Sequence, residues 1–299
     1  MKKDGREIAR TYEQRVLKAL HKFGWLRTRD LAALIWMRGG KPKPTGFVPE
    51  PIVVEPSAWR MAQRTLARLR KSSKVLWIQA PDGSIIYGLA EAGARQLVGL
   101  GIPASSGKDL VRRISLSHFH HRRLANEIAI LASLQGYRVA SEREIATGQW
   151  LGGKDGIAGK VPDVIVRQGQ AIWWIEVERS RRNQRDEAAI RAFLMNIWAG
   201  VGQVADKLAL PAGHKLKQVL FICENAFIDR LHADLRAAGW SDETWNQRIA
   251  ACRLLYVTEA KFLLKPESRC PGETRRGAAK LPVAITGVGL GRGSSQGSL

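Results

Sequence analysis

The chain has 299 residues, of which 45% are apolar, and 48 lysines and arginines against 27 acidic residues give it a formal net charge of +21. This length predicts two domains. No run of 18 or more apolar residues occurs, which excludes a transmembrane helix, and the first residues lack the apolar segment of a signal peptide. Three widely spaced cysteines, Cys223, Cys252 and Cys270, fit neither a disulfide framework nor a zinc site. We therefore expect a cytoplasmic protein with no membrane partner.

The positive charge is concentrated in the N-terminal third, where residues 1–115 hold 22 basic and 9 acidic residues. Basic proteins gain affinity for phosphate backbones because binding releases counterions. The charge therefore predicts a nucleic-acid partner that the N-terminal third contacts, and a generally basic protein without such a partner is the plainer alternative.

The first hundred residues predict helices and a hairpin. Apolar spacing indicates helices over 8–22 and 28–36, the second capped by Thr28. Residues 38–56 hold five prolines and three glycines, which predicts a loop. A third helix is expected over 57–73, capped by Ser57, followed by a hairpin around "PDG" and a helix from Glu91.

Helix, helix, basic helix and hairpin is the order of a winged helix-turn-helix, whose third helix enters the major groove while the wing touches the DNA backbone. The polar face of the third helix would then contact double-stranded DNA. A solvated charged face is the alternative. The expected contacts are Arg60, Gln63, Arg64, Arg68, Lys71 and Lys74.

The rest of the chain predicts a second, α/β unit. We expect a winged helix domain over 1–100, a linker over 101–116, an α/β domain over 117–265 and a disordered basic Gly/Ser-rich tail over 266–299. Within the second domain a helix starts at Ser117, a glycine-rich loop covers 147–160, and strands alternate with helices thereafter. This order indicates layers of helices on a small mixed sheet.

The stretch "VPDVIVRQGQAIWWIEVERS" (161–180) holds three carboxylates at the end of an apolar hairpin. Because side chains alternate along a strand, Glu176 and Glu178 share the face of Trp174. A two-residue turn at 168–169 would pair residue 163 with 174, and Asp163 would lie on the same face, one step from Glu176.

Such a carboxylate cluster needs compensation, because removing ions from water costs several kcal/mol each. Two explanations stay open. One is a salt-bridge network with nearby arginines, and the other is an oxygen-lined site for Mg²⁺ or Mn²⁺, which could activate water against a phosphodiester. The arginines are Arg179, Arg181, Arg182 and Arg185.

"VPDVIV" followed by "WWIEVE" resembles the Pro-Asp and Glu-x-Lys core of the PD-(D/E)XK nuclease superfamily. The resemblance implies that Asp163 and Glu176 hold the metal, with the Val177 carbonyl as a third ligand. It implies that Glu178, at the position of the lysine, and Glu127, on the preceding helix, belong to the catalytic set. Glutamate in place of lysine occurs in some restriction nucleases and also in inactive relatives.

The combined order of winged helix, "SHFHH" helix, "VPD" and "EVERS" resembles the replication-relaxation family, which includes MobC-type mobilisation proteins of plasmids and integrative elements. The resemblance covers residues 8–265. It implies a DNA-binding relaxosome protein that nicks an origin of transfer or replication in a metal-dependent reaction, with other relaxosome or coupling proteins as partners and a homodimer left open.

Other functions remain as alternatives. The protein could be a non-catalytic relaxosome accessory or transcriptional regulator with an inactive nuclease fold, or a repair or restriction nuclease that needs no origin. His118, Phe119 and His120 form the His-hydrophobic-His triplet of HUH relaxases, but they lead into a helix rather than a strand. The histidine cluster of "SHFHH" is therefore expected to contact phosphate or to pack against the carboxylates. No GxxxxGK[ST] loop is present, so we expect no ATP hydrolysis.

Overall fold

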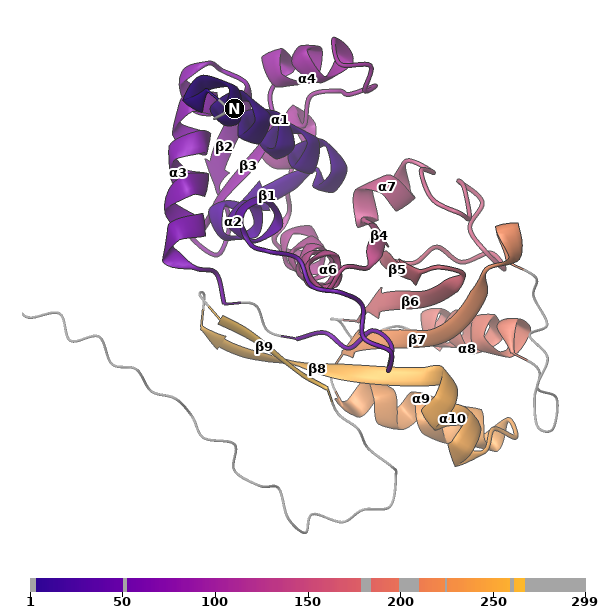
Figure 1. Cartoon of the computed structure of the whole chain (residues 1–299). Coiled ribbons are helices and arrows are strands. Elements are labelled where there is room, and N and C mark those ends of the chain that lie inside the picture. The colour runs from indigo at the N-terminus through magenta and orange to yellow at the C-terminus, as the bar shows by residue number, and fades with distance from the viewer. Residues whose placement is uncertain are drawn as a thin grey trace, which may run out of the picture. The chain divides into compact units, whose positions relative to one another are not determined.

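The structure is a computed structural model, and it describes residues 4–50, 53–178, 184–198, 210–223, 225–258 and 261–266. It has a mixed α/β architecture with two sheets (Figure 1). Residues 1–268 form one compact unit. Among the helices of the described ranges, none combines the length and apolar content needed to cross a bilayer. The elements of the first part are α1 (Gly5–Phe23), β1 (Trp25–Arg27), α2 (Thr28–Trp36), α3 (Pro56–Lys71), β2 (Val75–Gln79), β3 (Ile85–Leu89), α4 (Glu91–Val98) and α5 (Lys108–Arg112).

The second part carries the larger sheet. Its elements are α6 (Leu116–Leu134), β4 (Arg138–Ala140), α7 (Glu142–Ala146), β5 (Val164–Gln168), β6 (Ala171–Val177), α8 (Gln184–Ile197), the 3₁₀ turn η1 (Pro211–Gly213), β7 (Lys215–Cys223), α9 (Asn225–Ala237), α10 (Asp242–Arg248), β8 (Ile249–Thr258) and β9 (Lys261–Pro266). The strand order is β4-β5-β6-β7-β8-β9. Only β6, β7 and β8 run parallel, so the sheet is mixed, as predicted.

The smaller sheet has the order β1-β3-β2, and β2 and β3 form the predicted hairpin. Helix bounds differ slightly from the expected ones. The cap of α2 is Arg27, because the Asp30 carboxylate accepts from the Arg27 amide, and α3 starts at Pro56 after the cap Glu55. Proline suits the first helical position because the amide it lacks would have no partner there.

Two layers of helices enclose the larger sheet, with α6 on one face and α8, α9 and α10 on the other (Figure 1). The tryptophans of β6 divide accordingly. Trp173 belongs to the core beneath α6, whereas Trp174 belongs to the core with Phe193 of α8. The alternation expected from the sequence is confirmed at this strand.

The core under α6 continues into the N-terminal part, where it includes Leu17 of α1, Leu31 of α2 and Leu66 of α3. Residues 101–116, expected to be a linker, contain α5, and Val111 is fully buried against the smaller sheet. The segment packs there because the Gly107 amide donates to the Leu89 carbonyl. The two parts of the chain are therefore joined by packing as well as by sequence.

The loop between α2 and α3 reaches across to the larger sheet. The Gly40 amide donates to the Leu134 carbonyl at the end of α6. Phe47 is buried against Tyr137, and Tyr137 in turn meets the edge of Trp173. The described part of 38–56 has no strand and is a loop until α3 begins, as predicted, but it is anchored on the second part of the chain.

The C-terminal elements extend further than predicted. Helix α10 and strand β9 were not expected, and strand β4 ends at Ala140 because Ser141 caps α7. Cys223 and Cys252 are buried and are not joined by a disulfide, and burial raises the pKa of Cys252 to about 12. Cys270 and the predicted tail after residue 266 lie outside the described residues.

Candidate functional site

Asp163 and Glu176 lie opposite each other where β5 begins and β6 ends. The turn between these strands is 169–170, because Gln168 pairs with Ala171, and the predicted turn was one residue too early. The turn length is still even, so Asp163 keeps its predicted parity with Glu176 and comes directly opposite it. The Asp163 amide donates to the Ile175 carbonyl at 3.0 Å and extends the pairing to this point.

Glu176 is buried and has two polar neighbours. Its Oε1 accepts from Trp174 Nε1 at 2.6 Å, and Lys160 Nζ lies 3.0 Å from its Oε2. Burial raises the pKa of Glu176 above its ordinary value, the Lys160 ammonium opposes the rise, and the Asp163 carboxylate adds to it. Lys160 thus places a positive charge where two carboxylates repel each other.

Asp163 is held from both sides. Its Oδ2 accepts from the Val177 amide at 2.7 Å, and its Oδ1 lies 3.3 Å from His121 Nε2 on α6. Burial alone would lower the pKa of His121, but the hydrogen bond to Asp163 and its charge outweigh burial and raise it. Helix α6 therefore contributes a histidine to the site, in addition to covering the sheet.

Lys160 is presented by the glycine-rich loop that precedes β5. Ile157 and Lys160 exchange backbone hydrogen bonds, and Gly156 has a φ of +78°. A Cβ on Gly156 would lie 2.4 Å from the Lys160 carbonyl oxygen, so the turn requires glycine. Lys160 was not predicted as a site residue, whereas the histidines at the start of α6 were expected to contact phosphate or to pack against the carboxylates, and His121 does pack against Asp163. The loop's glycines were the only sequence signal for Lys160, and nothing local reports its pairing with Glu176.

The remaining predicted members of the acidic site are at the end of β6 or follow it in the sequence. Glu178 is buried directly after β6, and its amide donates to the Ile222 carbonyl of β7. The described backbone places Val177 between the two glutamates, and its carbonyl as a metal ligand stays a prediction. Arg179, Arg181 and Arg182, named as salt-bridge partners, lie outside the described residues, as does the side chain of Arg185.

The donor set fits a hard divalent cation in part. Each oxygen of Asp163 and Glu176 already faces a protein donor. A carboxylate oxygen has two lone pairs, so one such contact does not by itself prevent the oxygen from binding a cation. Mg²⁺ is commonly bound through one or two carboxylates and several waters. Within the described ranges, no cluster of three or more His, Cys, Asp and Glu side chains is placed to hold a metal.

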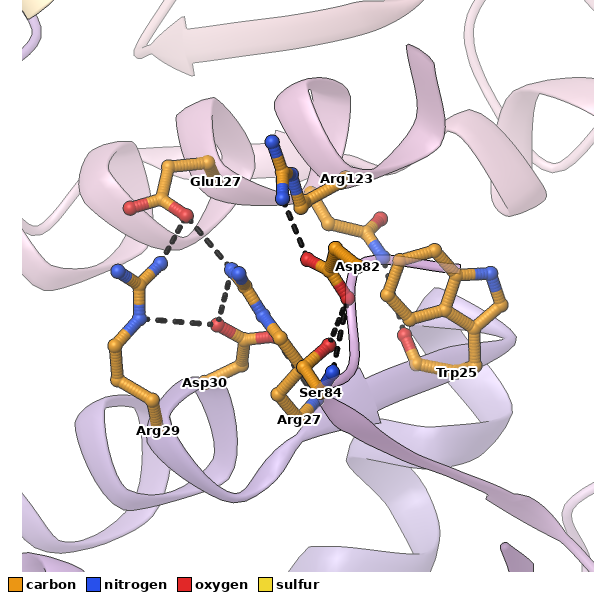
Figure 2. A network of polar contacts seen from close by, with 9 residues as sticks. Trp25, Arg27, Arg29, Asp30, Asp82, Ser84, Arg123 and Glu127 are labelled. Atoms are coloured by element: carbon orange, nitrogen blue, oxygen red, sulfur yellow. Dashed lines mark hydrogen bonds and ion pairs between the residues drawn. The ribbon is translucent and has the colours of Figure 1, made fainter. Parts of the chain in front are cut away.

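Glu127 belongs to a network of polar contacts with the N-terminal part of the chain (Figure 2). Its Oε2 accepts from Arg27 at 2.9 Å and pairs with Arg29, both from the N-terminal part of the chain. Arg27 also binds Asp30 through its Nε and Nη2, each at 3.0 Å. The structure thus places Glu127 in a junction between α2 and α6, and it does not bring the carboxylate together with Asp163 and Glu176.

This junction is an ionic cluster that water hardly reaches. The side chains of Arg27 and Glu127 are each 8% exposed and that of Asp30 is 2% exposed. Burial lowers the pKa of Arg27, but Asp30 and Glu127 outweigh it and raise the pKa. Burial raises the pKa of Asp30, but Arg27 and Arg29 outweigh it and lower the pKa. Arg27 and Asp30 therefore both stay charged near neutral pH.

The turn of the β2–β3 hairpin is docked on the same helix (Figure 2). Asp82 Oδ2 accepts from Arg123 Nη1 of α6 at 2.6 Å, and Asp82 Oδ1 accepts from the Ser84 amide and hydroxyl. Both side chains of the ion pair are at most 5% exposed. The tip of the expected wing thus faces α6, and a wing contact to DNA must come from the strands.

Asp82→Asn is expected to lower the free energy of unfolding at pH 7 by about 2 kcal/mol, because it removes the charge that a buried arginine needs. Burial raises the pKa of Asp82, but Ser84 and Arg123 outweigh it and lower the pKa. This contribution is therefore complete above the unfolded-state pKa and disappears as the pH falls through the folded-state pKa. Urea unfolding at pH 7 and at pH 3 checks it, and an equal loss at both values would contradict it.

The expected DNA-binding residues lie mostly on one exposed face of α3. Arg60, Gln63, Arg64 and Lys71 are exposed, and in the described part of the chain none of the three cations among them forms an ion pair. Arg68 differs, since its Nε binds Glu13 of α1 at 2.9 Å. Lys74 follows the helix and is half-buried. The structure thus groups four of the six predicted residues.

The histidine triplet lies on a helix, as expected. His118 and His120 belong to the first turns of α6, and Phe119 between them is buried against Trp25 at a ring distance of 5.2 Å. A strand that would present both histidines to a metal is not present at these positions.

Comparisons with known proteins give no assignment. No protein-family model matches the chain, and searches of curated proteins and of solved structures found no match.

Proposed function

We propose that the chain binds duplex DNA through the exposed face of α3 and cuts one strand with a metal-dependent site at Asp163 and Glu176. The observation that carries the proposal is the direct opposition of these two carboxylates at the strand ends, with Lys160 against Glu176 and His121 against Asp163. The likeness to PD-(D/E)XK nucleases and to the replication-relaxation family suggests an origin of transfer or replication as the target.

The residues of the acidic site would have different roles in the reaction. Asp163 and Glu176 would hold Mg²⁺ or Mn²⁺, and such an ion supplies a Lewis acid and an activated water for phosphodiester hydrolysis. Lys160 brings the ammonium that the sequence lacks at Glu178, and it approaches Glu176 from the loop instead of from β6. The Val177 amide and His121 fix the orientation of the Asp163 carboxylate.

The N-terminal part would act as the reading unit, a winged helix-turn-helix in which α3 lies along the DNA. Three features support this: the exposed unpaired cations of α3, the adjacent β2–β3 hairpin and the excess positive charge of residues 1–115. Phosphate contacts position such a unit, and base-edge contacts give it specificity.

A non-catalytic accessory or regulator is the second candidate. The observation that favours it is the occupation of all four oxygens of Asp163 and Glu176 by protein donors, which stabilises the pair without a metal. In this second candidate function, α3 still binds DNA but the protein does not cut it. Incubation of supercoiled origin plasmid with the protein and Mg²⁺ or Mn²⁺ separates the two, since only a nuclease yields open circles.

Arg60→Ala and Arg64→Ala are each expected to weaken duplex binding about fivefold or more, and each lost phosphate contact lowers the slope of log K against log salt by about one. Fluorescence anisotropy with a labelled origin fragment at several salt concentrations measures both quantities. Arg68→Ala is the matched control on the same helix. Its guanidinium is neutralised by Glu13, so its loss should be smaller. Equal affinity and slope for wild type and both variants would contradict the proposal.

A further inference from the structure

An open hollow of about 630 Å³ lies between the end of α3 and strand β2, with Arg70, Lys71 and Trp77 in its lining. Strand β2 is an edge strand of the smaller sheet, since it pairs with β3 alone. The hairpin turn is attached to α6 through Asp82. The edge of β2 that faces away from β3 is left at the surface.

Trp77 is the unusual residue of this hollow. It shares a strand face with Val75, which is buried in the core with Leu69 of α3, but Trp77 itself has an exposed fraction of 46%. The Arg70 guanidinium lies over its ring at 4.3 Å from the centroid. A half-exposed indole under a planar cation presents an apolar stacking surface beside positive charge.

We propose that this hollow binds an unpaired base of single-stranded DNA, with the base stacked on the Trp77–Arg70 pair and its flanking phosphate at Lys71. Aromatic side chains that alternate with cations are the usual means of holding single strands, since every base has a π-face. In a duplex both faces of a base are stacked on neighbours, so the platform selects unpaired bases. The positive surroundings favour a polyanion over an apolar protein partner.

This site would extend the proposed DNA binding. It rests on the proposed function only in taking the ligand to be DNA. Strand cutting at an origin acts on DNA that is open or becomes open, and a stacking platform next to α3 would hold one strand while the helix holds the adjacent duplex.

The test compares two probes, a fluorescein-labelled 12-nucleotide single strand and a duplex of the same sequence, in anisotropy titrations with the full chain. Trp77→Ala is expected to weaken single-strand binding about tenfold, in the range of alanine substitutions at stacking aromatics, and to leave duplex binding within twofold. Trp77→Phe should retain most of the affinity. Arg70→Ala should weaken single-strand binding severalfold, whereas Arg113→Ala, an 83% exposed arginine on another segment, should not.

Three results would overturn the inference. Single-strand affinity could be unchanged by Trp77→Ala, or both probes could lose affinity equally, which would make Trp77 part of the duplex interface. Alternatively, sedimentation velocity could show self-association that Trp77→Ala abolishes without any change in single-strand affinity, which would make Trp77 a protein contact. If the wild type binds the single strand through Trp77 but not the duplex, the proposal for α3 fails and this one stands.

Discussion

Asp163→Asn and Glu176→Gln are each expected to reduce the conversion of supercoiled origin plasmid to open circles by about 100-fold or more, because each removes a negative charge that would hold the divalent cation, and that cation would stabilise the anionic transition state. Both substitutions keep the size of the side chain. In Glu176→Gln the Lys160 ammonium also loses its nearest anion. The measurement is the initial rate of nicking in Mg²⁺ and in Mn²⁺ on an agarose gel.

A second measurement does not depend on activity. Mn²⁺ binding, followed by electron paramagnetic resonance of the free ion, should weaken in both variants. Asp109→Asn is the control, an exposed acid of α5 that pairs with Arg113. Nicking that persists in both variants would exclude Asp163 and Glu176 as its origin.

Lys160→Met separates the two candidate functions. In a nuclease the ammonium acts in the reaction, so the variant should bind Mn²⁺ at least as well as wild type and cut far more slowly. In an accessory protein the ammonium only neutralises the carboxylates, so Mn²⁺ affinity should rise while no cutting is seen in either protein. Weaker Mn²⁺ binding in the variant would contradict both roles of Lys160.

Glu127→Ala is expected to lower the free energy of unfolding by about 3 kcal/mol, because it leaves the buried Arg27 and Arg29 with one carboxylate fewer. Arg27 keeps Asp30, which places the effect at the lower end for broken buried pairs. Urea unfolding at pH 7 measures it. Glu142→Ala, which breaks the more exposed pair with Arg122, is the control and should cost less than about 1 kcal/mol.

A double-mutant cycle of Glu127→Ala with Arg29→Ala gives the coupling between the two side chains and should show that the losses are not additive. A loss below about 0.5 kcal/mol in Glu127→Ala would contradict a structural role for the junction.

Glu127→Gln tests the catalytic role of Glu127 against its structural role. If the carboxylate acted in catalysis, as the resemblance implies, nicking would fall steeply while the protein stayed folded. The junction predicts that cutting is kept wherever the fold is kept.

The junction also makes the stability of the fold depend on pH in the acidic range. The folded-state pKa of Asp30 lies below its ordinary value of 3.8, so its contribution to stability is complete above that value and is lost as the pH falls further. The folded-state pKa of Asp82 is also lowered, so its contribution to stability is likewise lost as the pH falls. Asp82 attaches the N-terminal part to α6 directly, and Asp30 holds Arg27, which in turn binds Glu127 of α6, so this attachment should weaken in acid.

The local patterns of the sequence determined much of the fold. The alternation in β6 separated Trp173 from Trp174, the "PDG" segment marked the hairpin, and the helical spacing of α3 marked its exposed basic face. These features depend on residues a few positions apart, whose periods of 2 and 3.6 are properties of the backbone. The even turn length was also enough to bring Asp163 to Glu176, although the turn itself was misplaced by one residue.

The partners of charged groups were decided by tertiary structure alone. Glu127 meets Arg27 across 100 residues and Arg123 meets Asp82 across 41, and Arg68 turns to Glu13 instead of remaining free on its helix. A charge takes the nearest opposite charge that packing brings within reach, and no local period records that distance. For the same reason the sequence supplied the carboxylates at 163 and 176, whereas only the folded chain placed Lys160 and His121 beside them.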